Sequence, residues 1–85
     1  MNERECEEML GHNLRVTREL SGLSRWELAE RSKVSERTIS NIEEARQSAE
    51  IHTVFQLAEA LDSDIADLLQ GIEWTPGEDP NEAER

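Results

Sequence analysis

The sequence predicts an all-α protein with one small domain, and three observations carry this prediction. Apolar residues recur at intervals of three and four, the period of an amphipathic helix, in several segments separated by turn residues. No segment shows the alternation of apolar and polar residues that is typical of a strand. With 85 residues, the chain can build one modest hydrophobic core but not two.

The first predicted helix runs from about Glu5 to Leu20. Its inward face includes Leu10 and Leu14, which are four residues apart and therefore lie one above the other on a helix. Gly22 follows, and glycine readily adopts the left-handed conformation in which many helices end.

The second predicted helix opens with a capping box. Ser24 stands at the N-cap and Glu27 follows three residues later, so that each side chain can bond the backbone N–H of the other. The helix is expected to end near Arg31–Ser32, and Lys33–Val34 make a short turn.

The third predicted helix runs from Glu36 to about Glu44, with Ser35 as its N-cap. A helix this short is stable only if its apolar side, Ile39 and Ile42, docks into a core. Its other side is then free to contact a partner. That side carries Glu36, Arg37, Ser40 and Asn41.

Two further helices are predicted in the C-terminal half. A wide apolar stripe indicates a helix from about Glu50 to Leu61. Asp64 can cap a short fifth helix with Asp67 at the capping-box position, and Gly71 ends it. The resulting division is an acidic extension over residues 1–8, a domain over residues 9–74 and an acidic tail over residues 75–85.

The charge of the chain is polarised. The formal net charge is -11, yet seven of the nine basic residues lie between residues 11 and 46, where they meet only six Glu. This segment holds the second and third helices and is the part of the surface suited to an anionic partner.

Several function classes lack the residues they need. Cys6, His12 and His52 are too few for a metal cluster, and one cysteine forms no intramolecular disulfide, which fits a reducing cytoplasm. The sequence has no Gly-rich phosphate loop, no nucleophile set beside a base and no apolar run of membrane-spanning length. We therefore expect no enzyme, no cofactor and no metal.

An ordered set of short motifs over residues 10–69 resembles the Cro/phage-repressor type of helix-turn-helix transcriptional regulator, also called the xenobiotic-response-element family. This resemblance implies a five-helix, lambda-repressor-like fold that binds double-stranded DNA, most simply as a repressor. The motifs are Leu14–Arg15 with Arg18, Leu23–Ser24 before Glu27–Leu28–Ala29, Val34–Ser35 before Thr38–Ile39–Ser40 and Ile42–Glu43, then Leu57–Ala58, Ala60–Leu61 and Leu68–Leu69.

The resemblance also implies which residues meet DNA. Base edges would be contacted by Glu36, Arg37 and Asn41, with Ser40 able to reach either a base or a phosphate. Arg37 can donate twice to guanine, Asn41 can pair with adenine, and Glu36 can accept from cytosine. The DNA backbone would be contacted by Ser24, Arg25, Ser35, Thr38 and Arg46.

For four residues we expect a structural role rather than a contact with DNA. The resemblance makes Arg18 and Glu43 a structural ion pair, and Trp26 is expected to be a partly buried packing residue. The family often has glycine where Ala45 stands. Because alanine adopts a left-handed conformation only at a cost, we expect the third helix to end differently or run longer.

A homodimer is expected, since the family usually pairs two domains across two-fold related half-sites. The C-terminal half holds more apolar surface than one small domain can bury. Trp74 is expected to cover one end of the core, with a partner contact as the alternative. The expected dimer surface comprises Val54, Phe55, Ile65, Leu68, Leu69, Ile72 and Trp74.

One alternative function stays open, which is an interaction module or antitoxin that uses the same fold. The net charge of -11 favours it, because acidic tails can engage a basic protein partner. In either case, residues 1–4 and 76–85 are expected to be disordered and to add nothing to the fold. If the protein reads DNA, these tails should also lower its affinity for DNA, whereas tails that serve as a docking site for a basic partner should leave that affinity unchanged.

Overall fold

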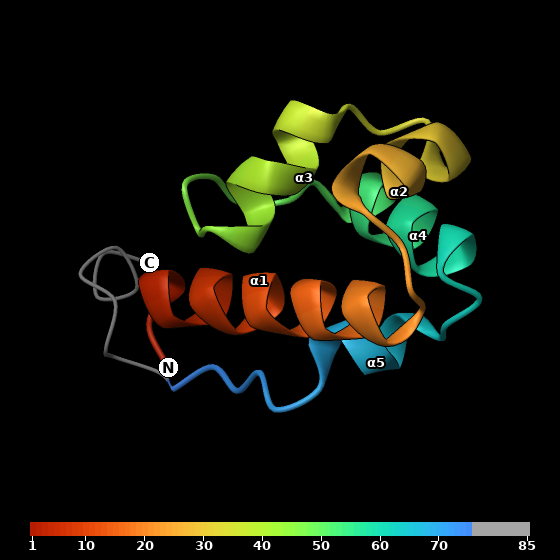
Figure 1. Cartoon of the computed structure of the whole chain (residues 1–85). Coiled ribbons are helices and arrows are strands. Elements are labelled where there is room, and N and C mark those ends of the chain that lie inside the picture. The colour runs from red at the N-terminus through yellow and green to blue at the C-terminus, as the bar shows by residue number, and fades with distance from the viewer. Residues whose placement is uncertain (76–85) are drawn as a thin grey trace.

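The computed structural model describes residues 1–75, which contain five helices and no strand (Figure 1). The all-α prediction is therefore confirmed, and the predicted disorder of residues 76–85 lies outside the described part of the chain. The helices are α1 (Glu3–Leu20), α2 (Arg25–Ser32), α3 (Glu36–Glu43), α4 (Ile51–Ala60) and α5 (Ile65–Leu69).

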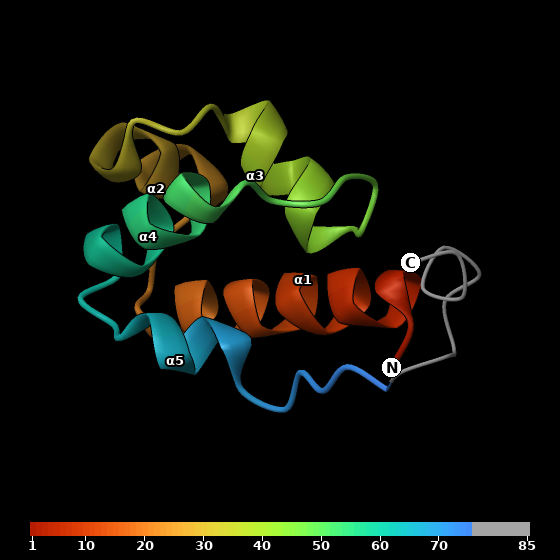
Figure 2. The same ribbon diagram turned by 180° about the vertical axis from the view of Figure 1, so that it is seen from behind.

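The long helix α1 crosses the molecule, with α2, α3 and α4 on one side of it and α5 on the other (Figures 1 and 2). It contacts α3 and α5, while α2 contacts α3 and α4, and α4 contacts α5. After α5 the chain runs back along α1 to its N-terminal end. The side chain of Asn13 fixes this return, since its amide donates to the carbonyl oxygens of Leu68 at 2.9 Å and Gln70 at 2.8 Å.

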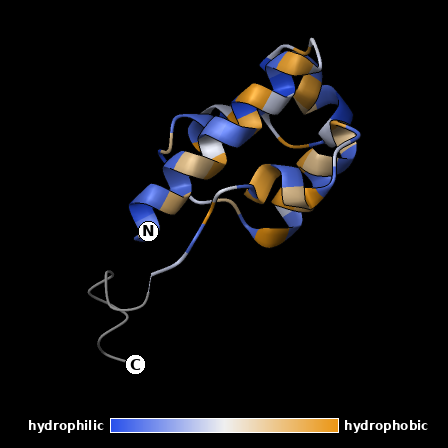
Figure 3. Ribbon diagram, turned by 90° about the horizontal axis from the view of Figure 1, so that it is seen from below, coloured by the Kyte–Doolittle hydropathy of each residue, from blue (hydrophilic) through white to orange (hydrophobic). Residues whose placement is uncertain are grey.

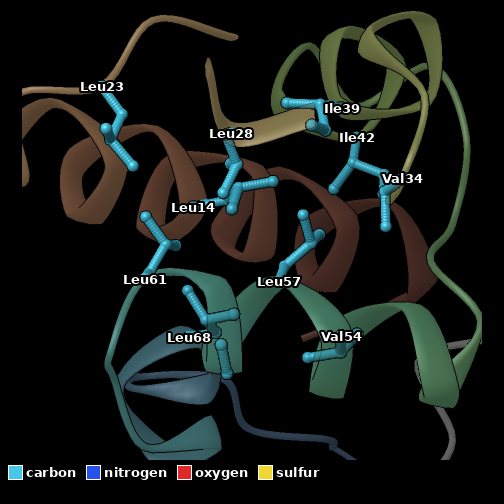
Figure 4. Packing of buried hydrophobic residues seen from close by; sticks show 11 residues of the cluster. Leu14, Leu23, Leu28, Val34, Ile39, Ile42, Val54, Leu57, Leu61 and Leu68 are labelled. Carbon is cyan, nitrogen blue, oxygen red and sulfur yellow. The ribbon is translucent and has the colours of Figure 1, made fainter. Parts of the chain in front are cut away.

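The core lies between the helices, and every helix supplies at least one fully buried side chain to it (Figure 4). Burying one Leu or Ile side chain contributes about 1.5–3 kcal/mol, so even the five-residue α5 is anchored. The largest fully buried side chains are Leu14, Leu28, Ile39, Ile42, Leu57 and Leu68.

No helix in residues 1–75 combines the length and the apolar character needed to cross a membrane. Figure 3 shows the reason, since hydrophilic and hydrophobic residues alternate around the helices and the N-terminal turn of α1 is hydrophilic.

The N-terminal end differs from the prediction. Helix α1 begins at Glu3 rather than Glu5, because Asn2 forms an N-cap. The Asn2 side chain accepts from the Glu5 N–H at 2.9 Å, and the Glu5 carboxylate accepts from the Asn2 N–H at 3.0 Å. The Met1 amine also donates to Thr75 Oγ1 at 2.8 Å. The expectation that residues 1–4 add nothing to the fold is thus wrong.

The end of α3 also differs from the prediction. Ala45 adopts the left-handed conformation with φ 56°, so α3 ends at Glu43, as it would with glycine in that position. The conformation lets the Arg46 N–H bond the Asn41 carbonyl at 2.7 Å and the Ala45 N–H bond the Ile42 carbonyl at 3.1 Å. These bonds satisfy the last carbonyls of the helix and offset the steric cost of an alanine there.

Gly11 marks the crossing of α1 over the end of α3 and was not singled out from the sequence. A Cβ atom at Gly11 would lie 2.4 Å from the Ile42 carbonyl oxygen and 2.8 Å from that of Glu43. Only a residue without a side chain permits this approach, because both neighbours are backbone atoms.

Both tryptophans are more exposed than predicted. Trp26 is 61% exposed rather than partly buried, because it lies two residues before the fully buried Leu28 and therefore on the opposite side of α2. Trp74 is 44% exposed and does not close the core.

Two residues of the predicted dimer surface are not at the surface of the single chain. Val54 and Leu68 are buried in the core of the single chain and cannot meet a partner without unfolding it. Phe55 and Leu69 are exposed, and α4 adds an exposed apolar residue that the prediction omitted, Ile51.

Candidate nucleic-acid interface

Helices α2 and α3 are joined by a short turn, and a serine caps each of them. The Ser24 hydroxyl accepts from the Glu27 N–H at 3.0 Å, and the Glu27 carboxylate returns the bond to the Ser24 N–H at 2.9 Å. The bond that the Glu27 carboxylate accepts from the Ser24 backbone, followed by the effect of the Ser24 side chain, lowers the pKa of Glu27. The Ser35 hydroxyl accepts from the Thr38 N–H at 3.1 Å and donates to the Thr38 hydroxyl.

The N-terminal half of α3 presents its polar side chains to solvent. Ile39 and Ile42 are buried and hold the helix against the core, which leaves Glu36 and Arg37 exposed. Neither Glu36 nor Arg37 forms a side-chain hydrogen bond or an ion pair with any described residue. Both are therefore available to a partner.

The C-terminal half of α3 is occupied by contacts within the chain. The Asn41 amide nitrogen donates to Gln47 Oε1 at 2.9 Å, and Asn41 Oδ1 accepts from Arg46 Nε at 3.2 Å. The Ser40 hydroxyl donates to Glu44 Oε2 at 2.8 Å. Two residues with a predicted base-reading role are thus engaged in the free protein.

The two arginines predicted to contact the DNA backbone both pair with Glu44. Arg25 Nη1 and Arg46 Nη2 each lie 3.3 Å from Glu44 Oε2. The hydrogen bond from Ser40, together with the positive charges of Arg46 and Arg25, lowers the pKa of Glu44. Ser40, Glu44, Arg25 and Arg46 are called the Glu44 cluster below.

A buried carboxylate lies directly behind this cluster. Arg18 Nε is 2.7 Å from Glu43 Oε2, and Arg18 Nη2 is 3.0 Å from Glu43 Oε1, so the pair is bidentate. The Glu43 side chain is fully buried, and its hydrogen bond raises the pKa of Arg18. Arg18 also donates to the Leu23 carbonyl at 2.9 Å, which ties the connection between α1 and α2 to the same guanidinium group.

Arg25 also contacts Glu43, which was not expected. Its Nε lies 3.1 Å from Glu43 Oε1, so one carboxylate joins α1, α2 and α3. No buried side-chain nitrogen or oxygen in residues 1–75 lacks a partner. No local pattern could have shown this contact, because Arg25 and Glu43 are 18 positions apart.

The predicted DNA-contacting residues largely converge on one surface. A shallow hollow over α3 gathers six of them, whereas the capping residues Ser24, Ser35 and Thr38 do not line it. Its lining residues are Arg25, Glu36, Arg37, Ser40, Asn41 and Arg46. Within residues 1–75, no group of three or more His, Cys, Asp or Glu side chains could hold a metal ion.

Comparison with known proteins shows which family this chain belongs to. The helix-turn-helix domain family matches residues 9–70, most of the chain and all five helices except the first turns of α1. The chain belongs to this family. No curated protein sequence matches it.

Solved structures place this helix-turn-helix protein among Cro/C1-type regulators. The clp gene regulator ClgR from C. glutamicum is 34% identical, with a TM-score of 0.71 over 75% of this chain and 83% of that one. The restriction-modification controller protein C.AhdI from Aeromonas hydrophila is 27% identical, with a TM-score of 0.71 over 73% of this chain and 94% of that one.

A third match supports the fold alone. An HTH_3 family transcriptional regulator from Vibrio cholerae is 23% identical, with a TM-score of 0.74 over 75% of this chain and 36% of that one. Together these matches confirm the predicted lambda-repressor-like fold. The family match, with the two structures of 34% and 27% identity, assigns this helix-turn-helix protein to DNA-binding transcriptional regulators, a family that is not enzymatic.

Proposed function

We propose that this helix-turn-helix protein binds specific sites in double-stranded DNA as a small transcriptional repressor, with α3 in the major groove. The supporting observation is the pair Glu36 and Arg37, which are exposed and have no side-chain partner among residues 1–75, on a helix that the buried Ile39 and Ile42 anchor to the core. The major groove is wide enough to admit one helix. Repression is the simplest outcome, because a bound protein excludes other proteins from its site.

In this proposal, the two halves of α3 read DNA differently. Arg37 donates twice to a guanine and Glu36 accepts from a cytosine, and neither has to break an existing contact first. Asn41 pairs with an adenine only after it releases Gln47 and Arg46. Ser40, already bonded to Glu44, contacts a base or a phosphate.

The DNA backbone is contacted from the edges of α3. Arg25 and Arg46 lie on either side of the hollow and supply the positive charge. The capped helix N-termini at Ser24 and Ser35, with Thr38, add backbone N–H groups and hydroxyls that favour phosphate.

The proposed DNA-bound form is a homodimer on two half-sites about 34 Å apart. Exposed apolar side chains for the dimer interface are present in the C-terminal half, where Ile51 is 67% and Phe55 is 55% exposed on α4. Leu69 and Trp74 are also exposed, and Ile65 and Ile72 are half-buried. A protein that acts on the chromosome shares its compartment, so a cytoplasmic location is part of the proposal.

The test starts from genomic fragments that the purified protein retains, which are sequenced to find the site. Binding of Arg37→Ala to that site and to random duplex DNA is then compared with binding of Arg31→Ala, which removes an exposed arginine outside the hollow. Arg37→Ala should cost about 1–3 kcal/mol on the specific site and little on random DNA. Equal losses on the two DNAs would reject the reading role of Arg37.

The same experiment decides the alternative function. The net charge of -11 favours an interaction module or antitoxin that engages a basic protein. If the protein retains no fragment above the level of random DNA at low salt, where electrostatic binding is strongest, this alternative replaces DNA reading. A reporter placed behind the recovered site distinguishes repression from activation.

A further inference from the structure

One carboxylate oxygen in the interface accepts from three donors at once. Glu44 Oε2 lies 2.8 Å from the Ser40 hydroxyl and 3.3 Å from both Arg25 Nη1 and Arg46 Nη2. The donors come from the start of α2, from α3 and from the loop after α3. Segments that are distant in the sequence therefore converge on a single anionic atom.

These donors are the groups that bind phosphate oxygens in other proteins. Two guanidinium groups and a hydroxyl provide charge-assisted hydrogen bonds to any oxyanion, and a carboxylate oxygen resembles a phosphate oxygen in charge and size. The three side chains also line the hollow over α3, together with Arg37 and Asn41. The Glu44 cluster is thus an anion-binding position whose present occupant belongs to the chain itself.

The buried Glu43 helps to position the donors of the Glu44 cluster. Arg25 uses its Nε to bond the buried Glu43, and this contact directs its Nη1 toward Glu44. The Glu44 side chain is 40% exposed, so it can swing out of the cluster without disturbing the core. Both arginines have a contact that does not involve Glu44, since Arg25 Nε bonds Glu43 and Arg46 Nε bonds Asn41 Oδ1.

We propose that the Glu44 carboxylate occupies a DNA phosphate position and competes with the phosphate for Ser40, Arg25 and Arg46. This inference rests on the proposed function and adds a residue that limits it. The competition acts on every DNA sequence alike, because phosphates carry no sequence information. Discrimination between sites is then left to the contacts that Glu36, Arg37 and Asn41 make with base edges. The lowered pKa of Glu44 agrees with this role, since the competitor remains ionised at neutral pH.

The first test uses inorganic phosphate without DNA. Phosphate is titrated into the wild type, Glu44→Gln and Glu59→Gln while the arginine Nε signals are followed by NMR. Glu59→Gln is the matched control, since it removes one exposed carboxylate from α4, outside the Glu44 cluster. Two exposed ion pairs of ordinary strength correspond to about 2- to 30-fold, so Glu44→Gln should bind phosphate tighter by that factor and Glu59→Gln should match the wild type.

A second variant guards against a residual contact from the glutamine amide. Glu44→Ala removes every acceptor at this position and should bind phosphate at least as tightly as Glu44→Gln. If the two Glu44 variants do not exceed Glu59→Gln, or if the signals of Arg25 and Arg46 stay fixed, Glu44 is an ordinary surface charge and the inference is wrong.

The second test uses random duplex DNA over a range of salt concentrations. Glu44→Gln should bind tighter by a similar factor, with a dependence of log K on log salt that is steeper by about one, while Glu59→Gln keeps the wild-type slope. A Glu44→Gln variant that binds phosphate tighter while no variant binds DNA would support the anion site and contradict the proposed function. DNA binding that is equal in Glu44→Gln and Glu59→Gln would support the proposed function and contradict the competition.

Discussion

The two ends of α3 contrast in how their polar side chains are used. At the N-terminal end, Glu36 and Arg37 are exposed and unpartnered among the described residues. At the C-terminal end, Glu43 is fully buried between two arginines, and Glu44 pairs with two arginines at the surface. The eight residues of α3 and its C-cap Glu44 thus include both a part that is available to a partner and a part that is fixed by the rest of the domain.

This contrast shows that residue type does not reveal availability. Arg25, Arg37 and Arg46 look alike in the sequence, and each was predicted to touch DNA. Among residues 1–75, Arg37 has no side-chain partner, whereas the other two arginines are held by carboxylates. Any DNA contact by Arg25 or Arg46 is therefore an exchange of partners, and its net gain is smaller than a count of charges suggests.

The largest effect is expected from removing the buried carboxylate. Glu43→Ala leaves Arg18 and Arg25 without their shared partner, and breaking a buried ion pair in this way costs about 3 kcal/mol or more. Urea unfolding followed by circular dichroism measures the loss. Glu36→Ala, at the opposite end of α3, should stay within about 0.5 kcal/mol of the wild type. Equal effects from the two substitutions would remove the contrast between the ends.

A smaller loss is expected where α1 crosses the end of α3. In a helix interior, Gly→Ala normally stabilises by about 0.5–1 kcal/mol. Gly11→Ala should instead destabilise by about 1–3 kcal/mol, because its Cβ would clash with the Ile42 and Glu43 carbonyls. Hydrogen exchange should quicken first in the last turn of α3. A rise in the melting temperature would mean that α1 and α3 can move apart to accommodate the Cβ without loss of stability.

Two left-handed residues make a matched pair for the ends of α2 and α3. Lys33 has φ 64° and is exposed, so Lys33→Gly should raise the stability by about 1 kcal/mol. Ala45 has φ 56° but is 8% exposed, so Ala45→Gly relieves similar strain and loses a buried methyl worth about 0.8 kcal/mol. Its net effect should be near zero. Thermal melts of the two variants give the comparison, and an equal gain in both would show that the Ala45 methyl packs poorly.

The smallest expected effect is a difference in how the stability contributions of the N-terminal caps of α2 and α3 depend on pH. The Glu27 carboxylate closes the capping box of α2, and this lowers its pKa below the ordinary 4.5. Its contribution to stability is therefore complete above pH 4.5 and is lost as the pH falls through the lowered pKa. The stability difference between the wild type and Glu27→Gln should change only in that acid range. The cap of α3 has no carboxylate, so Ser35→Ala should cost the same at every pH tested between 4 and 7.

Local patterns in the sequence predicted the order of the helices well. Ser24 with Glu27, Ser35 before Ile39, and Gly22 with its left-handed φ are signals within a few residues, and the structure contains all of them. The Asn2–Glu5 capping box is equally local and could have been found by the same rule.

The remaining differences depend on contacts between distant segments. Ala45 is a local exception, since its left-handed conformation was judged from the preference of alanine alone, whereas bonds to the last turn of α3 override that preference. The close approach at Gly11 and the second arginine on Glu43 depend on how three helices cross. The sequence correctly predicted that the polar face of α3 lies at the surface. It did not predict the contacts that occupy half of this face, because they join α3 to α2 and to the α3–α4 loop.

The shared carboxylate Glu43 also has a thermodynamic consequence. Because α1, α2 and α3 are already joined through it, the protein would form the proposed DNA complex with α3 already in place and would lose little conformational entropy on docking. The heat capacity change of association then reports the surface buried between the two molecules rather than folding of the helix. A duplex that does not fit this fixed shape has to bend or widen its groove, so the deformability of the site contributes to which sequences are bound.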